Sequence, residues 1–280
     1  MKELHILNFG AGVQSTALYL MACKGELPIQ HAIFADTGNE PEHVYRHLEW
    51  CKGLKGPPIH VVRHYETSLG DNLVHGVGST GRRAISIPAF LVKPDGNRGM
   101  GRRQCSEEYK IKPIGRFIRR TLLRLQARAR WPDDVLLHQY FGISLDEAGR
   151  ALRIRVNINQ SYVHCEFPLL DRLWSRKECL QYLAAWPVPH PVWKSACTFC
   201  PYHSDAEWRK IRDNEPESWA YSVELDRKLR EPGTVYANAM TSTMYLHRSC
   251  VPLDQVQLDG DPAQPGLPGF SNECMGVCGV

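Results

Sequence analysis

Apolar and polar positions follow two different periodicities over the first 65 residues. Short apolar runs at residues 4–8, 32–35 and 59–63 predict buried strands, and the stretches between them, 13–24 and 41–54, have helical spacing. Strands that alternate with helices are typical of βαβ units, whose parallel strands are joined by right-handed crossovers. The pattern predicts an α/β fold with a doubly wound, mostly parallel sheet.

The middle of the chain predicts one more strand, one basic helix and a long loop. Residues 135–143 are a buried apolar run, so we expect the sheet to resume there, and residues 111–130 predict a basic helix. Residues 70–103 are rich in glycine, lysine and arginine. This composition predicts a long basic loop, either a lid over an anionic substrate or a disordered segment.

Helices are predicted in the C-terminal part. Residues 175–184 begin with Ser175 and carry Glu178 three positions later, which is the spacing of a capping box. Residues 205–230 also have helical spacing, with an interruption near Pro216.

The length of 280 residues suits one large domain with an appended lobe. The Pro/Gly-rich stretch 260–269 reads as a linker to a terminal cysteine pair. We therefore expect an α/β domain over residues 1–170 and a helical lobe that contains cysteines over residues 171–280.

The composition is that of a globular protein. Hydrophobic residues make up 43% of the chain and charged residues 23%, and no apolar run reaches the roughly 18 residues that span a membrane. The first residues include the acidic Glu3 and lack the apolar core of a secretion signal. We expect a cytoplasmic protein with no membrane partner.

The net charge is only +4, but its distribution is uneven. Residues 102–130 contain ten Lys/Arg, against the two acidic residues Glu107 and Glu108. A solvated basic helix and a groove for phosphates or a polynucleotide are both consistent with this run.

A glycine-containing turn joins the first predicted strand to the first predicted helix. Residues 9–16 read Phe-Gly-Ala-Gly-Val-Gln-Ser-Thr. Glycines let the backbone approach an anion, and the helix N-terminus supplies partial positive charge. A Walker A loop and a dinucleotide fingerprint are both excluded by the spacing.

This turn resembles the Ser-Gly-Gly-x-Asp-Ser loop of PP-loop ATP pyrophosphatases. The resemblance implies an adenine nucleotide held by Gly10, Gly12, Gln14 and Ser15, with Gln14 where the family has aspartate. A carboxylate there would hold Mg²⁺, so the substitution bears directly on metal-assisted ATP cleavage. The second strand ends at Asp36-Thr37-Gly38, which is similar to a turn of phosphoadenosine phosphosulfate (PAPS) reductases, and Asp36 is expected at the same ligand.

Ten cysteines favour metal binding or thiol chemistry over disulfides, because the cytosol keeps thiols reduced. The strongest signal is Cys197-Thr198-Phe199-Cys200, whose C-x₂-C spacing suits one metal centre. A redox pair is the weaker interpretation.

Residues 103–114, which include Cys105, resemble the segment of adenylyl-sulfate reductases that carries a Cys-Cys pair, here with one cysteine missing. The resemblance implies a [4Fe-4S] cluster on Cys105, Cys197 and Cys200. Related PP-loop tRNA thiolation enzymes use three cysteines and leave one iron open. Alternatively Cys274, Cys278 or His203 is the fourth ligand, and with His203 the same set suits structural zinc, which is the alternative cofactor.

Further residues are candidates for the same site. Arg102, Arg103 and Lys110 are expected to neutralise the nucleotide phosphates, and Lys110 also to take part in catalysis. Glu273-Cys274 partly resembles the C-terminal segment that carries the nucleophilic cysteine of sulfonucleotide reductases, so Cys274 is a candidate nucleophile or sulfur carrier.

Three functions are consistent with these observations. The first is sulfur transfer from a sulfur donor protein to a tRNA, DNA or small-molecule acceptor, with ATP or a related nucleotide and a [4Fe-4S] cluster. The second is reduction of a sulfonucleotide with a thiol reductant. The third is a non-catalytic nucleic-acid-binding module with structural zinc.

Overall fold

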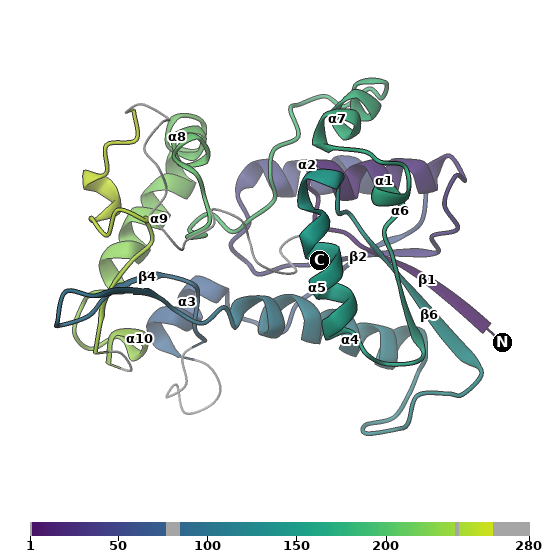
Figure 1. The fold of residues 1–280 in the computed structure, drawn as a ribbon, viewed down its shortest axis with the longest axis horizontal. Helices are drawn as coiled ribbons and strands as arrows, with labels where there is room; N and C mark the ends of the chain where they lie inside the picture. Colours follow the sequence, from purple (N-terminus) through teal and green to yellow (C-terminus); the bar gives the residue numbers. More distant parts are fainter. Residues whose placement is uncertain (1, 77–84, 239–240, 260–280) are drawn as a thin grey trace.

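The computed structural model describes residues 2–76, 85–238 and 241–259. Its centre is a five-stranded parallel sheet flanked by helices, which is an α/β architecture consistent with a doubly wound fold (Figure 1). In spatial order its strands are β3 (Ile59–Val62), β2 (His31–Ala35), β1 (Lys2–Asn8), β6 (Val135–Phe141) and β7 (Val163–Glu166). The predicted α/β class is thereby confirmed.

Helices cover both faces of this sheet. On one face, α1 (Val13–Cys23) and α2 (Glu42–Lys52) bury their apolar sides in a core that also takes in α7 (Arg176–Ala184). On the other face, Leu4 and Ile6 of β1 pack against Ile114 and Ile118, which belong to the helix that contains α4 (Lys112–Phe117). Two further helices, α5 (Ala148–Asn157) and α6 (Pro168–Asp171), lie at the β6–β7 side.

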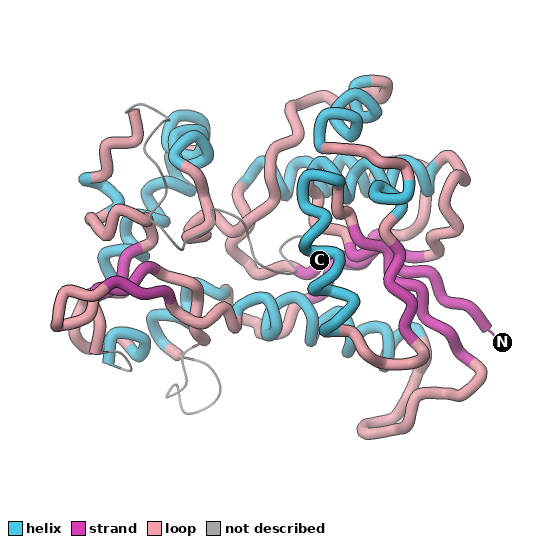
Figure 2. The backbone as a smooth tube through the Cα atoms, viewed as in Figure 1, coloured by secondary structure: helices cyan, strands magenta, loops and turns pink. Residues whose placement is uncertain are grey.

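A second lobe lies beside the sheet, at the left of Figures 1 and 2. Its core joins two distant parts of the chain, because Leu69 and Leu91 pack with Trp208, Leu225 and Leu246. The lobe contains an antiparallel sheet in the order β5-β4-β8. Its elements are α3 (Leu69–His75), β4 (Phe90–Val92), β5 (Arg98–Met100), α8 (Asp205–Asn214), α9 (Pro216–Lys228), α10 (Val235–Asn238), β8 (Thr243–Tyr245) and the 3₁₀ turn η4 (Leu253–Gln255).

This arrangement corrects the prediction of one long loop over residues 70–103. Within the described part of that stretch, α3, β4 and β5 are regular elements. The β4–β5 hairpin turns at Gly96, whose φ of 81° requires glycine, and Asp95 accepts hydrogen bonds from Asn97. Strands of three residues give too short an alternation to be recognised in a sequence.

The basic helix also differs from its predicted range of 111–130. It begins with the π-helical segment η1 (Glu107–Ile111), continues through α4 and ends with the π-helical segment η2 (Ile118–Leu122). Arg124, with φ of 53°, lies beyond this end. The helix α5 and strand β7 were not predicted, and neither was the 3₁₀ turn η3 (Leu145–Glu147) that precedes α5.

Two local predictions in the C-terminal part are confirmed. Ser175 and Glu178 form a capping box at α7, and the helical stretch after residue 204 is divided at Pro216 into α8 and α9. The helix α7 packs on α1, so residues 176–184 lie with the parallel sheet. No helix in the described ranges is long and apolar enough to cross a membrane.

Candidate functional site

A cavity of about 680 Å³ lies at the carboxyl ends of β1 and β6. The sheet order reverses between these two strands, because β2 and β3 lie on one side of β1 and β6 and β7 lie on the other. In open parallel α/β sheets, ligands bind at this topological switch point. The cavity is therefore where the architecture favours a binding site.

One wall of the cavity is the turn between β1 and α1, and the predicted residues Gly10, Gly12, Gln14 and Ser15 all line it. The turn folds around the Ser15 hydroxyl, which accepts hydrogen bonds from the backbone N–H of Gly10 (3.3 Å) and Gly12 (3.2 Å). The N-terminus of α1 thus lies at the wall. The first N–H groups of a helix have no acceptor within it, so this wall favours an anion.

The loop after β6 forms the adjoining wall and approaches the β1–α1 turn closely. A Cβ atom at Gly142 would lie 2.7 Å from the backbone nitrogen of Ser15, so only glycine fits there. Gln14 spans the two walls: its Nε2 lies 3.4 Å from the Ser144 hydroxyl, and its Oε1 accepts a hydrogen bond from Arg176 (3.2 Å).

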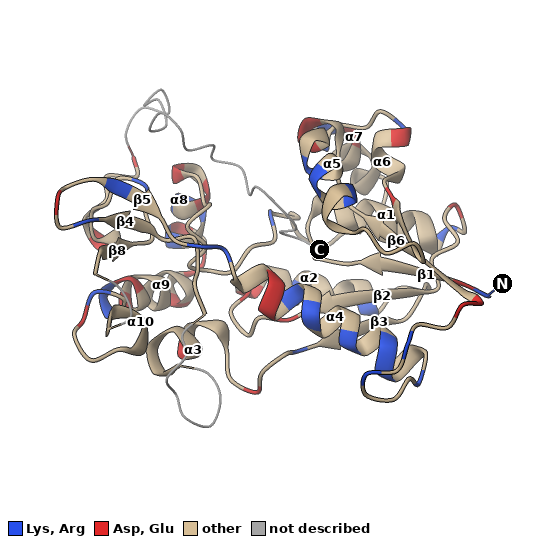
Figure 3. Cartoon of the chain, turned by 60° about the horizontal axis from the view of Figure 1, so that its bottom comes forward, with Lys and Arg blue, Asp and Glu red and all other residues tan. Residues whose placement is uncertain are grey.

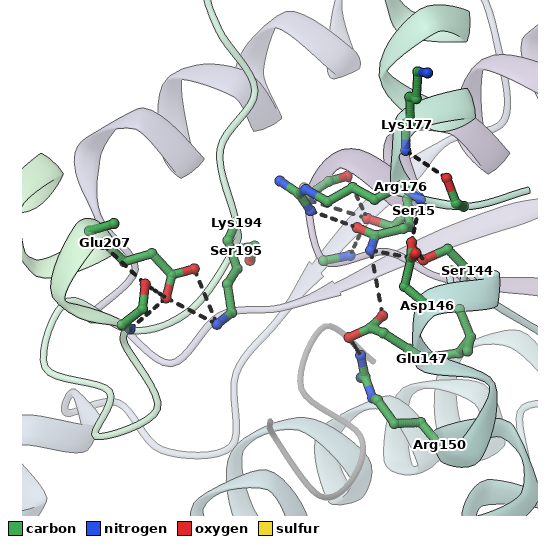
Figure 4. A pocket seen from close by; sticks show the side chains of 18 of the residues that line it. Ser15, Ser144, Asp146, Glu147, Arg150, Arg176, Lys177, Lys194, Ser195 and Glu207 are labelled. Atoms are coloured by element: carbon green, nitrogen blue, oxygen red, sulfur yellow. Dashed lines mark hydrogen bonds and ion pairs between the residues drawn. The ribbon is translucent and has the colours of Figure 1, made fainter. Parts of the chain in front are cut away.

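Charged side chains of both signs line this cavity, with basic ones in excess (Figure 4). Two ion pairs face each other across it: Arg150 with Glu147 (2.5 Å), and Lys194 with Glu207 (3.2 Å). Burial alone would raise the pKa of Glu207, but the nearby His203 and Lys194 hold it well below its usual range. The five basic residues of the wall are Arg150, Arg176, Lys177, Lys194 and Lys210, and the three acidic ones are Asp146, Glu147 and Glu207.

Asp36 is not among the residues that line the cavity. It is 4% exposed, and its carboxylate is engaged by three neighbours. Arg63 donates two hydrogen bonds to Oδ2, and Tyr45 and the backbone of Gly38 each donate to Oδ1 at 2.8 Å. In this structure Asp36 ties the end of β2 to the end of β3 and to α2.

The predicted basic residues also lie outside the cavity wall. Arg102 is exposed, and the Arg103 guanidinium lies 5.9 Å from the ring centre of Tyr202. Lys110 is buried, with its Nζ 3.5 Å from Oε1 of Glu40.

Cys197 has polar neighbours beyond the end of β2. Its Sγ is 3.2 Å from the Thr37 hydroxyl and 3.9 Å from Glu40, and the backbone of Thr198 donates to the carbonyl of Asn39 (2.9 Å). Burial and the Glu40 carboxylate raise the pKa of the Cys197 thiol well above its usual range, opposed by Lys110. Ser195, two residues earlier, lines the cavity, so one segment connects the two places.

The three predicted cysteine ligands lie in the same lobe-facing region but form no compact single-metal site. Cys105 and Cys197 both pack against the core of the second lobe, and Cys200 donates its backbone N–H to the carbonyl of Cys197 (2.9 Å). Within the described ranges, groups of three ligand atoms that lie within 4.8 Å of one another contain no cysteine. His203 turns its Nε2 to the carbonyl oxygen of Cys197 (2.9 Å). Cys274 and Cys278 lie outside the described residues.

Several cavity residues were not predicted as site residues: Asp146, Glu147, Arg176, Lys194 and Lys210. One signal was present in the sequence. Ser144-Leu145-Asp146-Glu147 directly follows the strand that neighbours β1, where a switch-point ligand is expected. No comparable signal marks Lys194 or Lys210, because they reach the cavity only through the packing of the second lobe against the sheet.

No protein-family model matches this chain, and no curated protein and no solved structure is significantly similar to it.

Proposed function

We propose that the protein is a PP-loop-like enzyme that binds an adenine nucleotide at the switch-point cavity and carries out sulfur chemistry beside it. The observation that supports this most is the place of the β1–α1 turn, which forms a wall of a roomy cavity at the carboxyl ends of β1 and β6. A helix N-terminus and an excess of basic side chains favour a phosphate there.

Within this proposal, the nucleotide phosphates lie at the N-terminus of α1, and Arg176, Lys194 and Lys210 contribute positive charge. Asp146 and Glu147 replace the carboxylate that Gln14 does not supply, since Gln14 Nε2 is 3.5 Å from Glu147. Carboxylate oxygens are the ligands that Mg²⁺ prefers, so these two residues would hold it.

The sulfur centre is proposed at Cys105, Cys197 and Cys200. The donor set is three thiols, which suits iron–sulfur ligation better than a hard cation. Such a [4Fe-4S] cluster would supply an iron that can carry sulfide. Lys110 and Thr37 would stabilise the thiolate form of Cys197, because both lower its pKa against the effect of burial and Glu40.

A nucleic-acid acceptor is supported by the surface of η1, α4 and η2. Figure 3 shows basic residues along this helix, and Lys112, Arg116 and Arg120 are exposed. Exposed cations in a row are the electrostatic footprint of polynucleotide binding.

The nucleotide part is tested by calorimetric titration of the full chain with ATP and with adenosine 5′-phosphosulfate. Arg176→Ala should weaken binding about 10- to 100-fold, since a charge-assisted hydrogen bond contributes about 1.5–3 kcal/mol. Lys52→Ala is the control, because Lys52 pairs with Glu49 near the end of α2 and does not line the cavity. Equal affinity of wild type and Arg176→Ala would contradict the proposed phosphate position.

The sulfur part is tested by assaying iron, acid-labile sulfide and zinc in anaerobic preparations of wild type and Cys197→Ala. About four iron and four sulfide per chain, lost in the variant, are expected. About one zinc and no iron would reject the cluster and favour a structural-zinc module.

A further inference from the structure

A second cluster of ligand-type side chains lies on β1, β6 and β7, away from the cavity wall. His5 is in register with His138, and His138 with His164, so their side chains project from one face of the sheet. The rings of His5 and His138 are stacked, with centres 4.4 Å apart and an interplanar angle of 7°. Both are largely buried, at 12% and 14% side-chain exposure, whereas Glu3 beside them is 56% exposed.

Hydrogen bonds engage the same nitrogen of each ring. His138 Nδ1 lies 2.8 Å from Glu166 Oε1, and His5 Nδ1 lies 3.0 Å from the Tyr140 hydroxyl. His138 Nε2 is buried and has no hydrogen-bond partner among the described residues. His5 Nε2 lies 3.4 Å from Glu3 Oε2.

The hydrogen bond between His138 and Glu166 is of the kind that metal-binding histidines make. Such a histidine donates one ring N–H to a carboxylate or similar acceptor, which fixes the tautomer and leaves the other nitrogen for the metal. Glu166 meets that description for His138. An unpartnered buried nitrogen is otherwise costly, so a ligand for His138 Nε2 also accounts for why it is buried.

We propose that Glu3, His5 and His138 bind a divalent first-row transition metal of the zinc class, with Glu166 orienting His138 from behind. One ligand atom from each of the three residues lies within 4.8 Å of the others. Two imidazoles and one carboxylate suit Zn²⁺ and leave one position for water. Because the His5 ring is stacked parallel to the His138 ring, it would turn so that both Nε2 atoms face the ion. The site is independent of the proposed nucleotide and sulfur chemistry, because none of its residues lines the cavity, and Cys105 and Cys197 pack against the core of the second lobe.

A neighbouring trio, His138, His164 and Glu166, also has ligand atoms within 4.8 Å of one another. A metal there would have to replace the hydrogen bond between His138 and Glu166, and His164 is exposed. The Glu3 trio keeps that hydrogen bond intact, which is why we assign the metal to it.

The test is a Co²⁺ titration of the full chain, followed by visible and near-ultraviolet absorption. Nitrogen and oxygen ligands give ligand-field bands alone, whereas cysteine ligands add thiolate charge transfer, so this site is distinguished from the thiol centre. The affinity to follow is that of the Co²⁺ site whose spectrum shows no thiolate charge transfer. Glu3→Gln and His138→Ala should each lower this affinity by at least about tenfold, and Glu166→Gln should lower it by about 10- to 100-fold.

His31→Ala and His164→Ala are the matched controls and should bind Co²⁺ as wild type does. His31 belongs to another cross-strand histidine pair, with its Nδ1 3.0 Å from His60 Nε2, but no carboxylate group accompanies it among the described residues. Glu3→Gln changes an exposed side chain, so its result holds even where His138→Ala fails to fold. Unchanged binding in Glu3→Gln, or loss in His164→Ala with binding kept in Glu3→Gln, would overturn the assignment.

Discussion

The carboxyl ends of β2 and β6 lie at the same edge of the sheet, one on each side of β1, and an aspartate follows each strand. Asp36, after β2, is 4% exposed and accepts hydrogen bonds from Arg63, Tyr45 and the Gly38 backbone. Asp146, after β6, is exposed on the cavity wall and accepts from the Arg176 backbone (2.6 Å). The two carboxylates occupy similar places in the fold but have different surroundings.

The difference shows that a carboxylate at the end of a parallel strand is not by itself a ligand-binding group. Whether it can bind a ligand depends on its partners within the protein. An aspartate whose oxygens are already engaged by an arginine, a tyrosine and a backbone amide stabilises the fold. An exposed aspartate with few partners remains able to bind a cation or substrate. We call the β2 end locked, because the Asp36 carboxylate is engaged by protein partners, and the β6 end open, because Asp146 is exposed.

The largest expected effect distinguishes the two aspartates by stability. Asp36→Ala should lower the free energy of unfolding by about 2–4 kcal/mol, because it leaves buried donors without an acceptor beside Arg63. Asp146→Ala should cost about 1 kcal/mol, the typical value for a lost helix-end hydrogen bond. Urea unfolding followed by circular dichroism measures both. Equal losses would contradict the distinction between locked and open ends.

The α2 helix, which Tyr45 ties to Asp36, should also make the stability of the protein depend on pH. Burial and the nearby His190 and His43 lower the pKa of His47 on α2 to about 4, from an ordinary 6.5. Its folded-state pKa lies below the unfolded one, so the stability that this difference contributes is complete above pH 6.5. It is lost as pH falls from 6.5 toward 4, by at most about 3 kcal/mol.

The variant His47→Gln isolates this contribution, because other histidines also titrate in that range. Glutamine keeps a hydrogen-bonding group near Thr16, whose hydroxyl lies 2.9 Å from His47 Nε2. Unfolding free energies of wild type and variant between pH 4 and 7 should therefore differ in slope. Parallel curves would mean that His47 is accessible to protons in the folded protein.

Much of the parallel sheet could be predicted from the sequence, because its signals are local. The residues of β1, α1 and β2 alternate between strand and helix periodicity. Each predicted end of these three elements lies within two residues of the end seen in the structure. The β1–α1 turn was predicted to lie at a ligand for the same reason, since a strand, a glycine turn and a helix are adjacent in the chain.

The rest depends on contacts between distant segments. Whether Asp36 faces a ligand or a protein partner depends on Arg63, 27 residues later, which no local pattern reveals. Lys194 and Lys210 reach the cavity through the packing of a lobe whose core joins residues near Leu69 to residues near Trp208. Sequence periodicity carries no information about such pairings.

A third prediction sharpens the comparison at the open end. Gly142→Ala would place a Cβ 2.7 Å from the Ser15 backbone nitrogen, so the turn around Ser15 must shift. We expect a loss of stability of about 1–3 kcal/mol and at least about tenfold weaker nucleotide binding, measured by calorimetry. Gly149→Ala is the matched control, since its nearest contact is the Arg153 side chain at 3.9 Å. In helix α5 it should raise stability by up to about 1 kcal/mol.

The smallest expected effect is on polynucleotide binding by the basic helix formed by η1, α4 and η2. As with the two aspartates, a charged side chain with an ion-pair partner is compared with one that forms no ion pair within the described part of the chain. Lys112 is paired with Glu108 (2.6 Å), whereas exposed Arg116 forms no ion pair with another described residue. If polynucleotide is the acceptor, Arg116→Ala should reduce the slope of log affinity against log salt by about 1. Lys112→Ala should change it less, because Glu108 already offsets its charge. A slope that neither variant alters would place the acceptor on another surface.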